Sequence, residues 1–199
     1  MTQEFLKKVY EVSGDDALRD LYDEWADSYD AETGAHGYAT PARCAEALRR
    51  CGLATDAEIL DMGCGTGLSG AAFAEAGFTT IDGSDLSPGM LDKARALGVY
   101  RDLWLPDNLP DRRYDAVAAV GVIGPGAAPL DLFDSCLEHL APGGLFVLSF
   151  NDHALNLPEF PARIARAVEA GVVLPRFEEH GPHLPGLDMK STVYVLEHT

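Results

Sequence analysis

Ile59-Leu-Asp-Met-Gly-Cys-Gly-Thr-Gly67 decides the fold of this chain, because an apolar run and an acid lead into a glycine-rich turn. The helix-like stretch 68–76 follows at once. Glycines let a backbone bend sharply and approach a ligand without a Cβ in the way, and the first turn of a helix offers unpaired N–H groups. Asp61 would repel a phosphate, whereas it suits a positive amine. The stretch predicts a nucleotide-type pocket for a ligand with a cationic amino-acid end.

A second strand-like run, 79–84, strengthens this interpretation because it also ends in an acid, Asp85. In a βαβ unit, an acid at the tip of the second strand can bind both ribose hydroxyls, about 20 residues after the glycines. Ser87 then reads as a helix N-cap with Pro88 at the first helical position, and Gly98 ends the helix. The two segments together predict a site for a ribose-containing ligand.

The segments 59–67 and 81–90 resemble the class I S-adenosylmethionine-dependent methyltransferases. In that family the glycine turn holds the methionine portion of the cofactor and the second acid holds the ribose. The resemblance runs from about Tyr22 to Asn151. It implies S-adenosyl-L-methionine as the cofactor and the following binding residues: Asp61, Gly63, Cys64, Gly65, Gly67, Asp85, Leu86 and Met90.

The resemblance extends to two later segments. Val120-Gly-Val-Ile123 would end the fourth strand beside the sulfonium, which implies Val120 as a cofactor contact. The adenine contact of the family comes from an acid after the third strand. Asp107, followed by Asn108, fits this position best, and Asp102 is the alternative. Asp107 can also be read as a turn-forming residue without a ligand.

An aromatic segment near the N-terminus, 22–30, resembles the Y-D-x-W-A-x-x-Y-D segment of small-molecule members of the family. The chain resembles the Williams–Beuren-region methyltransferase-like proteins within this family. In the small-molecule members the segment lies over the cofactor as a lid. The resemblance implies Tyr22, Trp25 and Tyr29 as cofactor contacts, and an aromatic face near the sulfonium would favour its charge. The helical spacing also fits the core face of an ordinary helix.

The glycines fit a rival pattern as well. Gly65-Thr-Gly-Leu-Ser-Gly70 satisfies G-x-G-x-x-G, and Asp85 lies at the right distance for the ribose of NAD. That pattern wants its first glycine directly after the strand, whereas Asp61, Gly63 and Cys64 intervene here. We favour the methyltransferase interpretation. An NAD(P)-dependent oxidoreductase and a glycine turn without a ligand remain as alternatives.

Alternating strand and helix patterns continue to the end of the chain and predict an α/β fold. We expect a Rossmann-like, doubly wound, mainly parallel seven-stranded sheet with helices on both faces and an N-terminal helical lid. One methyltransferase domain would span 1–199, with the lid at 1–52, the cofactor-binding core at 53–150 and a C-terminal part at 151–199 that closes the sheet. Further strands are expected at 99–105, 114–120, 145–150, 176–180 and 192–197, and further helices at 40–52, 129–140 and 160–170.

Composition narrows the class of partner. The 199 residues carry a net charge of −17, with 15 Lys and Arg against 32 Asp and Glu, which argues against nucleic acid as a partner. No run approaches the length of a membrane span and the N-terminus has no signal-peptide pattern, so we expect a cytoplasmic protein that binds no membrane. The four cysteines lack zinc-like spacing, and no metal is expected.

The expected activity is therefore methyl transfer from S-adenosylmethionine to a small-molecule acceptor. The sulfonium supplies the leaving group, so alignment of the acceptor matters most and a general base is optional. His153, just past the fifth strand, is a weak candidate for such a base. A protein that binds the cofactor without catalysis is the main alternative. The acceptor, the acceptor atom and the oligomeric state stay open.

Overall fold

The structure is a computed structural model that describes residues 19–21, 23 and 29–199. Tyr22 and Trp25 of the expected lid lie outside the described residues. Tyr29 begins helix α3 (Tyr29–Ala35), but its side chain is not described. The lid contacts therefore stay predictions.

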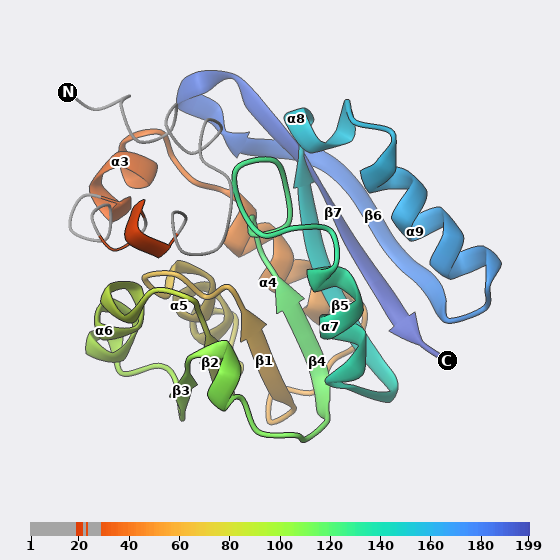
Figure 1. Cartoon of the computed structure of the whole chain (residues 1–199), viewed down its shortest axis with the longest axis horizontal. Helices are drawn as coiled ribbons and strands as arrows, with labels where there is room; N and C mark the ends of the chain where they lie inside the picture. Colours follow the sequence, from red (N-terminus) through yellow and green to blue (C-terminus); the bar gives the residue numbers. More distant parts are fainter. Residues whose placement is uncertain (1–18, 22, 24–28) are drawn as a thin grey trace.

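The described residues form one seven-stranded sheet with the order β3-β2-β1-β4-β5-β7-β6 (Figure 1). Strands β1 to β5 are parallel, and β7 lies antiparallel between β5 and β6. This arrangement confirms the predicted mainly parallel, Rossmann-like sheet. The strands are β1 (Glu58–Met62), β2 (Thr80–Ser84), β3 (Leu103–Trp104), β4 (Tyr114–Ala119), β5 (Leu140–Asn151), β6 (Val173–Leu184) and β7 (Met189–His198).

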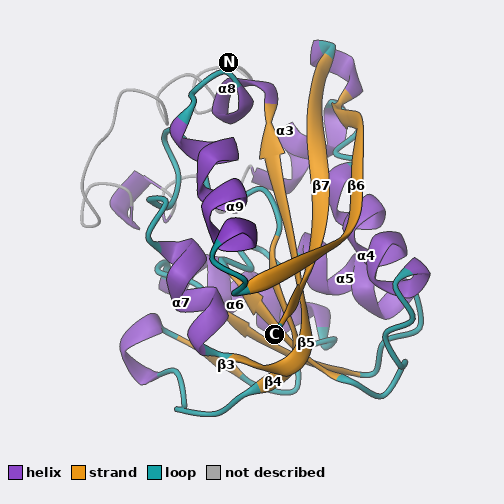
Figure 2. Cartoon of the chain, turned by 90° about the vertical axis from the view of Figure 1, so that its right-hand side faces the viewer, coloured by secondary structure: helices purple, strands orange, loops and turns teal. Residues whose placement is uncertain are grey.

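Helices cover both faces of the sheet, with α4 and α5 on one face and α7 and α9 on the other (Figure 2). The helices are α4 (Thr40–Arg50), α5 (Leu68–Glu75), α6 (Pro88–Leu97), α7 (Leu132–Glu138), α8 (Asp152–Leu155) and α9 (Glu159–Glu169), with the 3₁₀ turns η1 (Pro106–Asn108) and η2 (Pro185–Leu187). No helix of the described residues is long and apolar enough to cross a membrane.

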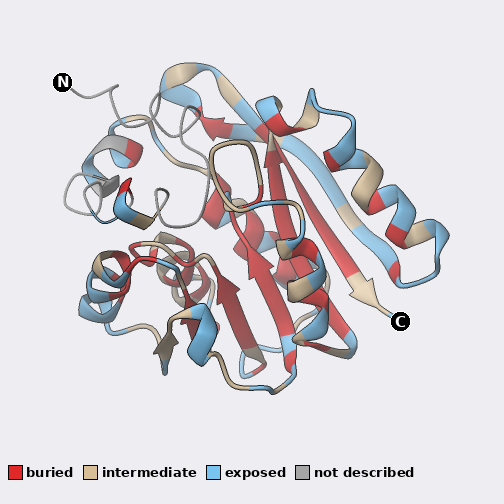
Figure 3. Ribbon diagram, viewed as in Figure 1, coloured by how far each residue is buried: buried red, intermediate tan, exposed pale blue. Residues whose placement is uncertain are grey.

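The core lies in two layers because side chains alternate along each strand. In β4, Val117 and Ala119 join the cluster under α7, whereas Ala116 and Ala118 join the cluster under α4 and α5. The central strands are buried and the outer sides of the helices are exposed (Figure 3). Strands buried on both faces explain why the sequence shows apolar runs here rather than a polar alternation.

The predicted ends of α6 are confirmed. The Ser87 side chain accepts a hydrogen bond from the Met90 N–H at 3.0 Å, as an N-cap does, and Pro88 is the first helical residue. Gly98 ends the helix with a left-handed φ of 68°. This helix fixes the segment that follows Asp85.

Three element boundaries differ from the sequence predictions. The third strand is only Leu103–Trp104, and the helix expected from residue 129 begins at Leu132 because residues 129–131 form a turn. The fifth strand begins at Leu140, before the Pro-Gly-Gly turn expected to precede it. Pairing with β4 resumes after an irregularity in the register, so the Gly-rich segment continues the strand instead of ending it.

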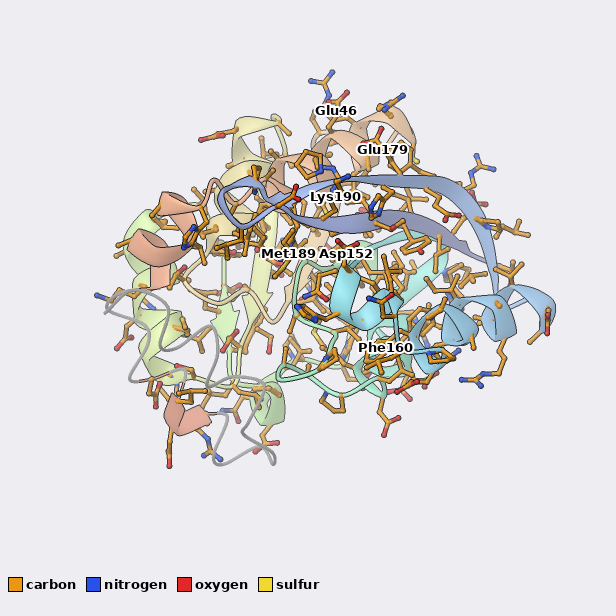
Figure 4. The ribbon with its side chains drawn as sticks, turned by 90° about the horizontal axis from the view of Figure 1, so that it is seen from above. Glu46, Asp152, Phe160, Glu179, Met189 and Lys190 are labelled. Atoms are coloured by element: carbon orange, nitrogen blue, oxygen red, sulfur yellow. The ribbon has the colours of Figure 1, made fainter. Side chains whose placement is uncertain are left out.

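Strands β6 and β7, which form a hairpin at one edge of the sheet, are about twice as long as their sequence patterns indicate. Strand β6 is an edge strand that pairs with β7 and is largely exposed, so it lacks an apolar run over most of its length. Charged residues and prolines such as Pro175 protect such edges from further pairing. Viewed from above, Glu46 of α4 and Phe160 of α9 lie on opposite sides of this hairpin (Figure 4).

A buried carboxylate, Asp82, connects β2 to the segment before β3 and to the start of β4. Its side chain has an exposed fraction of 0% and accepts hydrogen bonds from Arg101 (2.6 and 2.9 Å), Arg112 (2.6 Å) and the Tyr114 hydroxyl (3.1 Å). Because the guanidinium groups are about one-third exposed, part of their charge is still solvated.

We expect Asp82→Asn to lower the free energy of unfolding by about 2–3 kcal/mol, somewhat below the cost of about 3–5 kcal/mol for breaking a fully buried pair. Urea denaturation measures this change. Asp92→Asn, which breaks the exposed pair with Arg95 at 2.6 Å, should cost less than about 0.5 kcal/mol. Equal effects of the two variants would contradict a structural role for Asp82.

Candidate active site

Two adjoining cavities open at the carboxyl ends of β1, β2 and β4, where ligands bind in open α/β sheets. The larger has a volume of about 310 Å³, within the range of small-molecule sites. The smaller, of about 30 Å³, adjoins it at the glycine turn. Six residues implied by the sequence resemblance line the larger cavity: Gly63, Gly65, Asp85, Leu86, Met90 and Val120. Cys64 lines only the smaller one.

Asp85 follows β2 directly and faces the glycine turn. One carboxylate oxygen accepts a hydrogen bond from the Gly65 N–H at 2.8 Å, and the other accepts one from the Ser87 N–H at 3.0 Å. Burial raises the pKa of this carboxyl, and backbone hydrogen bonds, chiefly those from Ser87 and Gly65, oppose that shift. Since a carboxylate can accept about four hydrogen bonds, Asp85 retains capacity for two hydroxyls of a ligand.

Each glycine of the turn has a left-handed φ, but their missing side chains serve different purposes. A Cβ on Gly63 (φ 69°) would overlap Val122, and one on Gly67 (φ 98°) would overlap Leu97 and press on Tyr100. A Cβ on Gly65 (φ 55°) would meet nothing within 4 Å, because this residue opens onto the cavity. Gly65 is therefore the glycine of the turn whose backbone is free for close approach by a ligand.

Asp61 is fully buried within β1 and does not line either cavity. Its Oδ2 accepts hydrogen bonds from the Ser69 hydroxyl at 2.5 Å and the Tyr100 hydroxyl at 2.8 Å. Burial raises the pKa of Asp61 to about 6, although both hydrogen bonds lower it. Oδ1 is buried and has no hydrogen-bond partner among the described residues. Since Ser69 lines the smaller cavity, Asp61 lies one hydrogen bond behind the wall.

Tyr100 explains the last glycine of the pattern that resembles a dinucleotide fingerprint. A Cβ on Gly70 would overlap the Tyr100 ring, and the Gly70 N–H donates to the Tyr100 hydroxyl at 3.1 Å. Gly83 of β2 also has no room for a Cβ beside this ring. The aromatic side chain, rather than a pyrophosphate, accounts for glycine at position 70.

Several implied contacts do not line the cavities. Asp107 and Asn108 are exposed on η1, whose Pro106 does line the larger cavity. Gly67 faces Tyr100, as described above. His153 is exposed on α8 and lies outside both cavity walls. The roles of these residues in cofactor binding or catalysis stay predictions.

The resemblance placed 120–123 beside the sulfonium, but the sequence analysis missed the rest of the wall formed by the loop after β4 and the start of α7. This wall consists of Gly121, Val122, Ala127, Ala128, Pro129, Asp131, Leu132 and Ser135. Residues 124–128 carry no motif, and residues 129–135 were expected only as part of a helix. It also missed Asp23, whose carboxylate accepts hydrogen bonds from the Gly89 N–H at 3.0 Å and from the Ser87 hydroxyl at the start of α6.

The sheet order, the glycine turn after β1 and the acid after β2 together define a Rossmann-like nucleotide-binding domain. Within that class, a model of the family described as "Methyltransferase domain" matches residues 36–191. The chain belongs to this family, the class I S-adenosylmethionine-dependent methyltransferases. The match confirms the predicted family and assigns S-adenosylmethionine as the cofactor, and it does not support the nicotinamide alternative.

Three curated relatives illustrate the range of this family. Human methyltransferase-like protein 27 is 35% identical over 169 residues, which cover 81% of this chain and 66% of the human protein. The ribosomal protein L11 methyltransferase of Chromohalobacter salexigens is 35% identical (59% of this chain, 40% of that protein). A ubiquinone biosynthesis O-methyltransferase of Xylella fastidiosa is 30% identical (73% and 62%). The chain thus spans less than two-thirds of the length of each relative.

Solved structures support the fold. The [4+2]-cyclase SpnF superimposes with a TM-score of 0.71 at 15% identity, over 94% of this chain and 97% of SpnF. At this identity the likeness shows the fold alone.

We expect Gly65→Val to abolish cofactor binding, because its side chain would extend into the cavity from a backbone with φ 55°. Gly98→Val is the matched control, since Gly98 has a φ of 68° and equally open space around it, but lies at the end of α6 outside the cavity walls. Calorimetry with S-adenosylhomocysteine should show binding to the control variant only. Normal binding by Gly65→Val would remove the turn from the site.

Proposed function

We propose that this domain transfers the methyl group of S-adenosylmethionine to a small-molecule acceptor. The observation that carries the proposal is the convergence of Gly65 and Asp85 with the apolar loop after β4 in one cavity. The glycine and the acid suit the cofactor, and the loop supplies a wall for a second molecule. A site that holds both reactants side by side fits group transfer, in which alignment supplies much of the rate enhancement.

The residues present fit the cofactor in three respects. Asp85 has free acceptor capacity for a ribose, Gly65 leaves open space beside its backbone, and Asp61 has a buried oxygen without a partner. An orphaned carboxylate oxygen suits the ammonium group of a methionine moiety. When bound, the cofactor supplies an activated methyl group on its sulfonium. The chain itself binds the cofactor, orients the acceptor and excludes water.

The cavity wall supports a small, partly apolar acceptor. Val122, Pro129 and Leu132 present apolar surface, and Asp131 and Ser135 add polar groups to the same wall. Apolar walls with a few polar groups are typical of small-molecule sites. The name of the Xylella relative also refers to a small-molecule pathway, whereas that of the L11 relative refers to a protein acceptor. The net charge of −17 disfavours nucleic acid as the acceptor.

Two experiments test this proposal. Calorimetry should show binding of S-adenosylmethionine and S-adenosylhomocysteine but not of NAD. Incubation with S-adenosylmethionine and a metabolite panel, followed by mass spectrometry, should then reveal an acceptor whose mass increases by that of one CH₂ group. Methylation of ribosomal protein L11 without any methylated metabolite would overturn the small-molecule assignment. Cofactor binding without any product would indicate a sensor.

We expect Asp85→Ala to weaken S-adenosylhomocysteine binding at least about tenfold, because hydrogen bonds to charged groups contribute about 1.5–3 kcal/mol each. The variant should also unfold more easily, since two backbone N–H groups lose their acceptor. Circular dichroism therefore has to show folded protein before calorimetry. Asp92→Ala, on the exposed side of α6, serves as the control with unchanged affinity. An unchanged affinity for Asp85→Ala as well would place the ribose elsewhere.

A further inference from the structure

We propose that Tyr100 is a positioning residue for the amino-acid end of the cofactor: it holds Asp61 through Oδ2 so that Oδ1 is left for the ammonium group. This inference rests on the proposed function, because it assumes that S-adenosylmethionine occupies the cavity. It concerns a residue between α6 and β3, which no motif of the sequence analysis includes.

The position of the Tyr100 ring is fixed by packing. A Cβ on Gly70 would overlap the ring, and a Cβ on Gly67 or Gly83 would press against it as well as against Leu97 or Leu103. These glycines come from the turn, from α5 and from β2. A ring enclosed by three separate segments cannot swing away without moving the backbone of the site.

The Tyr100 hydroxyl links the helix α5 to the buried acid. It accepts a hydrogen bond from the Gly70 N–H at 3.1 Å and donates one to Asp61 Oδ2 at 2.8 Å. The N-cap residue of α5 is Gly67, which has no side chain to cap the helix, so Tyr100 satisfies one N–H of the first turn in its place. With its acceptor role used by Gly70, the hydroxyl presents its proton to Asp61.

The second donor acts on the same oxygen. Ser69 donates to Asp61 Oδ2 at 2.5 Å, so both hydrogen bonds meet at Oδ2 and fix the rotation of the carboxylate. Oδ1 stays buried and without a partner among the described residues. A buried acceptor without a partner is costly, and a charged ammonium group would satisfy it. Ser69 lines the smaller cavity, so the acid lies directly behind the wall that such a group would meet.

The two donors also favour the ionised form of Asp61. Burial raises its pKa to about 6, and loss of the Tyr100 hydrogen bond would raise this pKa further. The other titratable groups that act on it are Asp85 after β2, Cys64 in the turn, Cys44 of α4 and Tyr100 itself. Burial raises the pKa of both thiols and of the phenol, so these groups stay neutral near pH 7. Asp61 and Asp85 are therefore the groups that titrate here.

The test compares two ligands that differ only in the amino-acid end. S-adenosylhomocysteine carries the ammonium group, whereas 5′-methylthioadenosine keeps the adenosine part without it. Tyr100→Phe should weaken binding of S-adenosylhomocysteine about tenfold, as expected for a hydrogen bond to a charged group, and leave binding of methylthioadenosine unchanged. Ser69→Ala should give the same pattern, which keeps the test informative if Tyr100→Phe does not fold.

The pH dependence provides a second readout that a purely structural role would not change. An ammonium ligand favours ionised Asp61. The preference for S-adenosylhomocysteine over methylthioadenosine should therefore be fully present above the Asp61 pKa of about 6 and should fall at lower pH. In Tyr100→Phe this fall should begin at higher pH. Asp85 faces the part shared by both ligands, so its titration cancels in the ratio.

Tyr114→Phe is the matched control, since it also removes a phenol hydroxyl that donates a hydrogen bond to a buried carboxylate, here that of Asp82. It should change stability but not the ratio of the two affinities. If Tyr100→Phe weakens both ligands equally, or leaves the ratio and its pH dependence as in the wild type, Tyr100 only packs and the inference is wrong. Failure of the wild type to bind either ligand would instead refute the proposed function.

Discussion

The site depends on the burial of one carboxylate, Asp61, in strand β1 of the sheet. An isolated ionised acid in a dry interior is costly, and Asp61 has an exposed fraction of 0%. The fold meets this cost with two hydroxyl donors, one from the first turn of α5 and one from the segment after α6. The pKa of the acid nevertheless stays raised. A carboxyl only partly satisfied by its own chain is prepared to accept a cation, which a fully paired one would not be.

This constraint changes the meaning of the glycine pattern. A G-x-G-x-x-G motif is usually explained by the approach of a pyrophosphate to the backbone. In this chain Gly65 alone of the turn glycines opens onto free space, and Gly70 is glycine because the Tyr100 ring lies against it. The same sequence pattern therefore has a different structural cause in this chain. The acid Asp61 before the turn distinguishes the two cases, since it would repel a pyrophosphate and suits an amine.

Local signals in the sequence predicted the parts of the structure that local forces determine. The strand that contains Asp61, the helix from Pro88 that Gly98 caps and the acid at Asp85 each follow from a few neighbouring residues, and the structure places Asp85 in the cavity wall. The family resemblance supplied the number of strands and their mainly parallel arrangement, whereas their order came from the structure. Local and family signals agree because the turn, the helix and the sheet are mutually consistent.

What the sequence could not predict is what depends on contacts between distant segments. The partners of Tyr100 lie 30 and 39 residues away along the chain, and no periodicity marks such a side chain. The exposed edge strand β6 lacks the apolar run by which strands are recognised. The wall after β4 is irregular backbone, for which the sequence offers only glycines and prolines. Asp107 was chosen by resemblance, yet it is exposed beside the cavity rather than in its wall.

The long β6–β7 hairpin illustrates how such distant contacts shape the mouth of the site. Its tip hydrogen-bonds to the segment between α3 and α4, with Ala39 N–H donating to the His183 carbonyl at 2.9 Å and Gly186 N–H to the His36 carbonyl at 3.0 Å. The His183 ring packs edge-on against Tyr38, with ring centroids 5.2 Å apart. Tyr38 in turn lines the smaller cavity.

Buried polar side chains lie behind Tyr38, and burial keeps the His183 ring uncharged near neutral pH. Thr40 Oγ1 lies 2.8 Å from His183 Nδ1 and 3.0 Å from Ser191 Oγ, and the Arg43 guanidinium donates to Ser191 Oγ at 3.1 Å. Burial lowers the pKa of His183 to about 4, so the ring stays uncharged at neutral pH. The hydroxyl of Tyr38 lies against Gly121, where a Cβ would overlap it. The hairpin contacts Tyr38, which lines the smaller cavity, and Tyr38 contacts Gly121, which lines the larger one. Two segments 83 residues apart therefore meet where the two cavities adjoin, and the hairpin supports one of them.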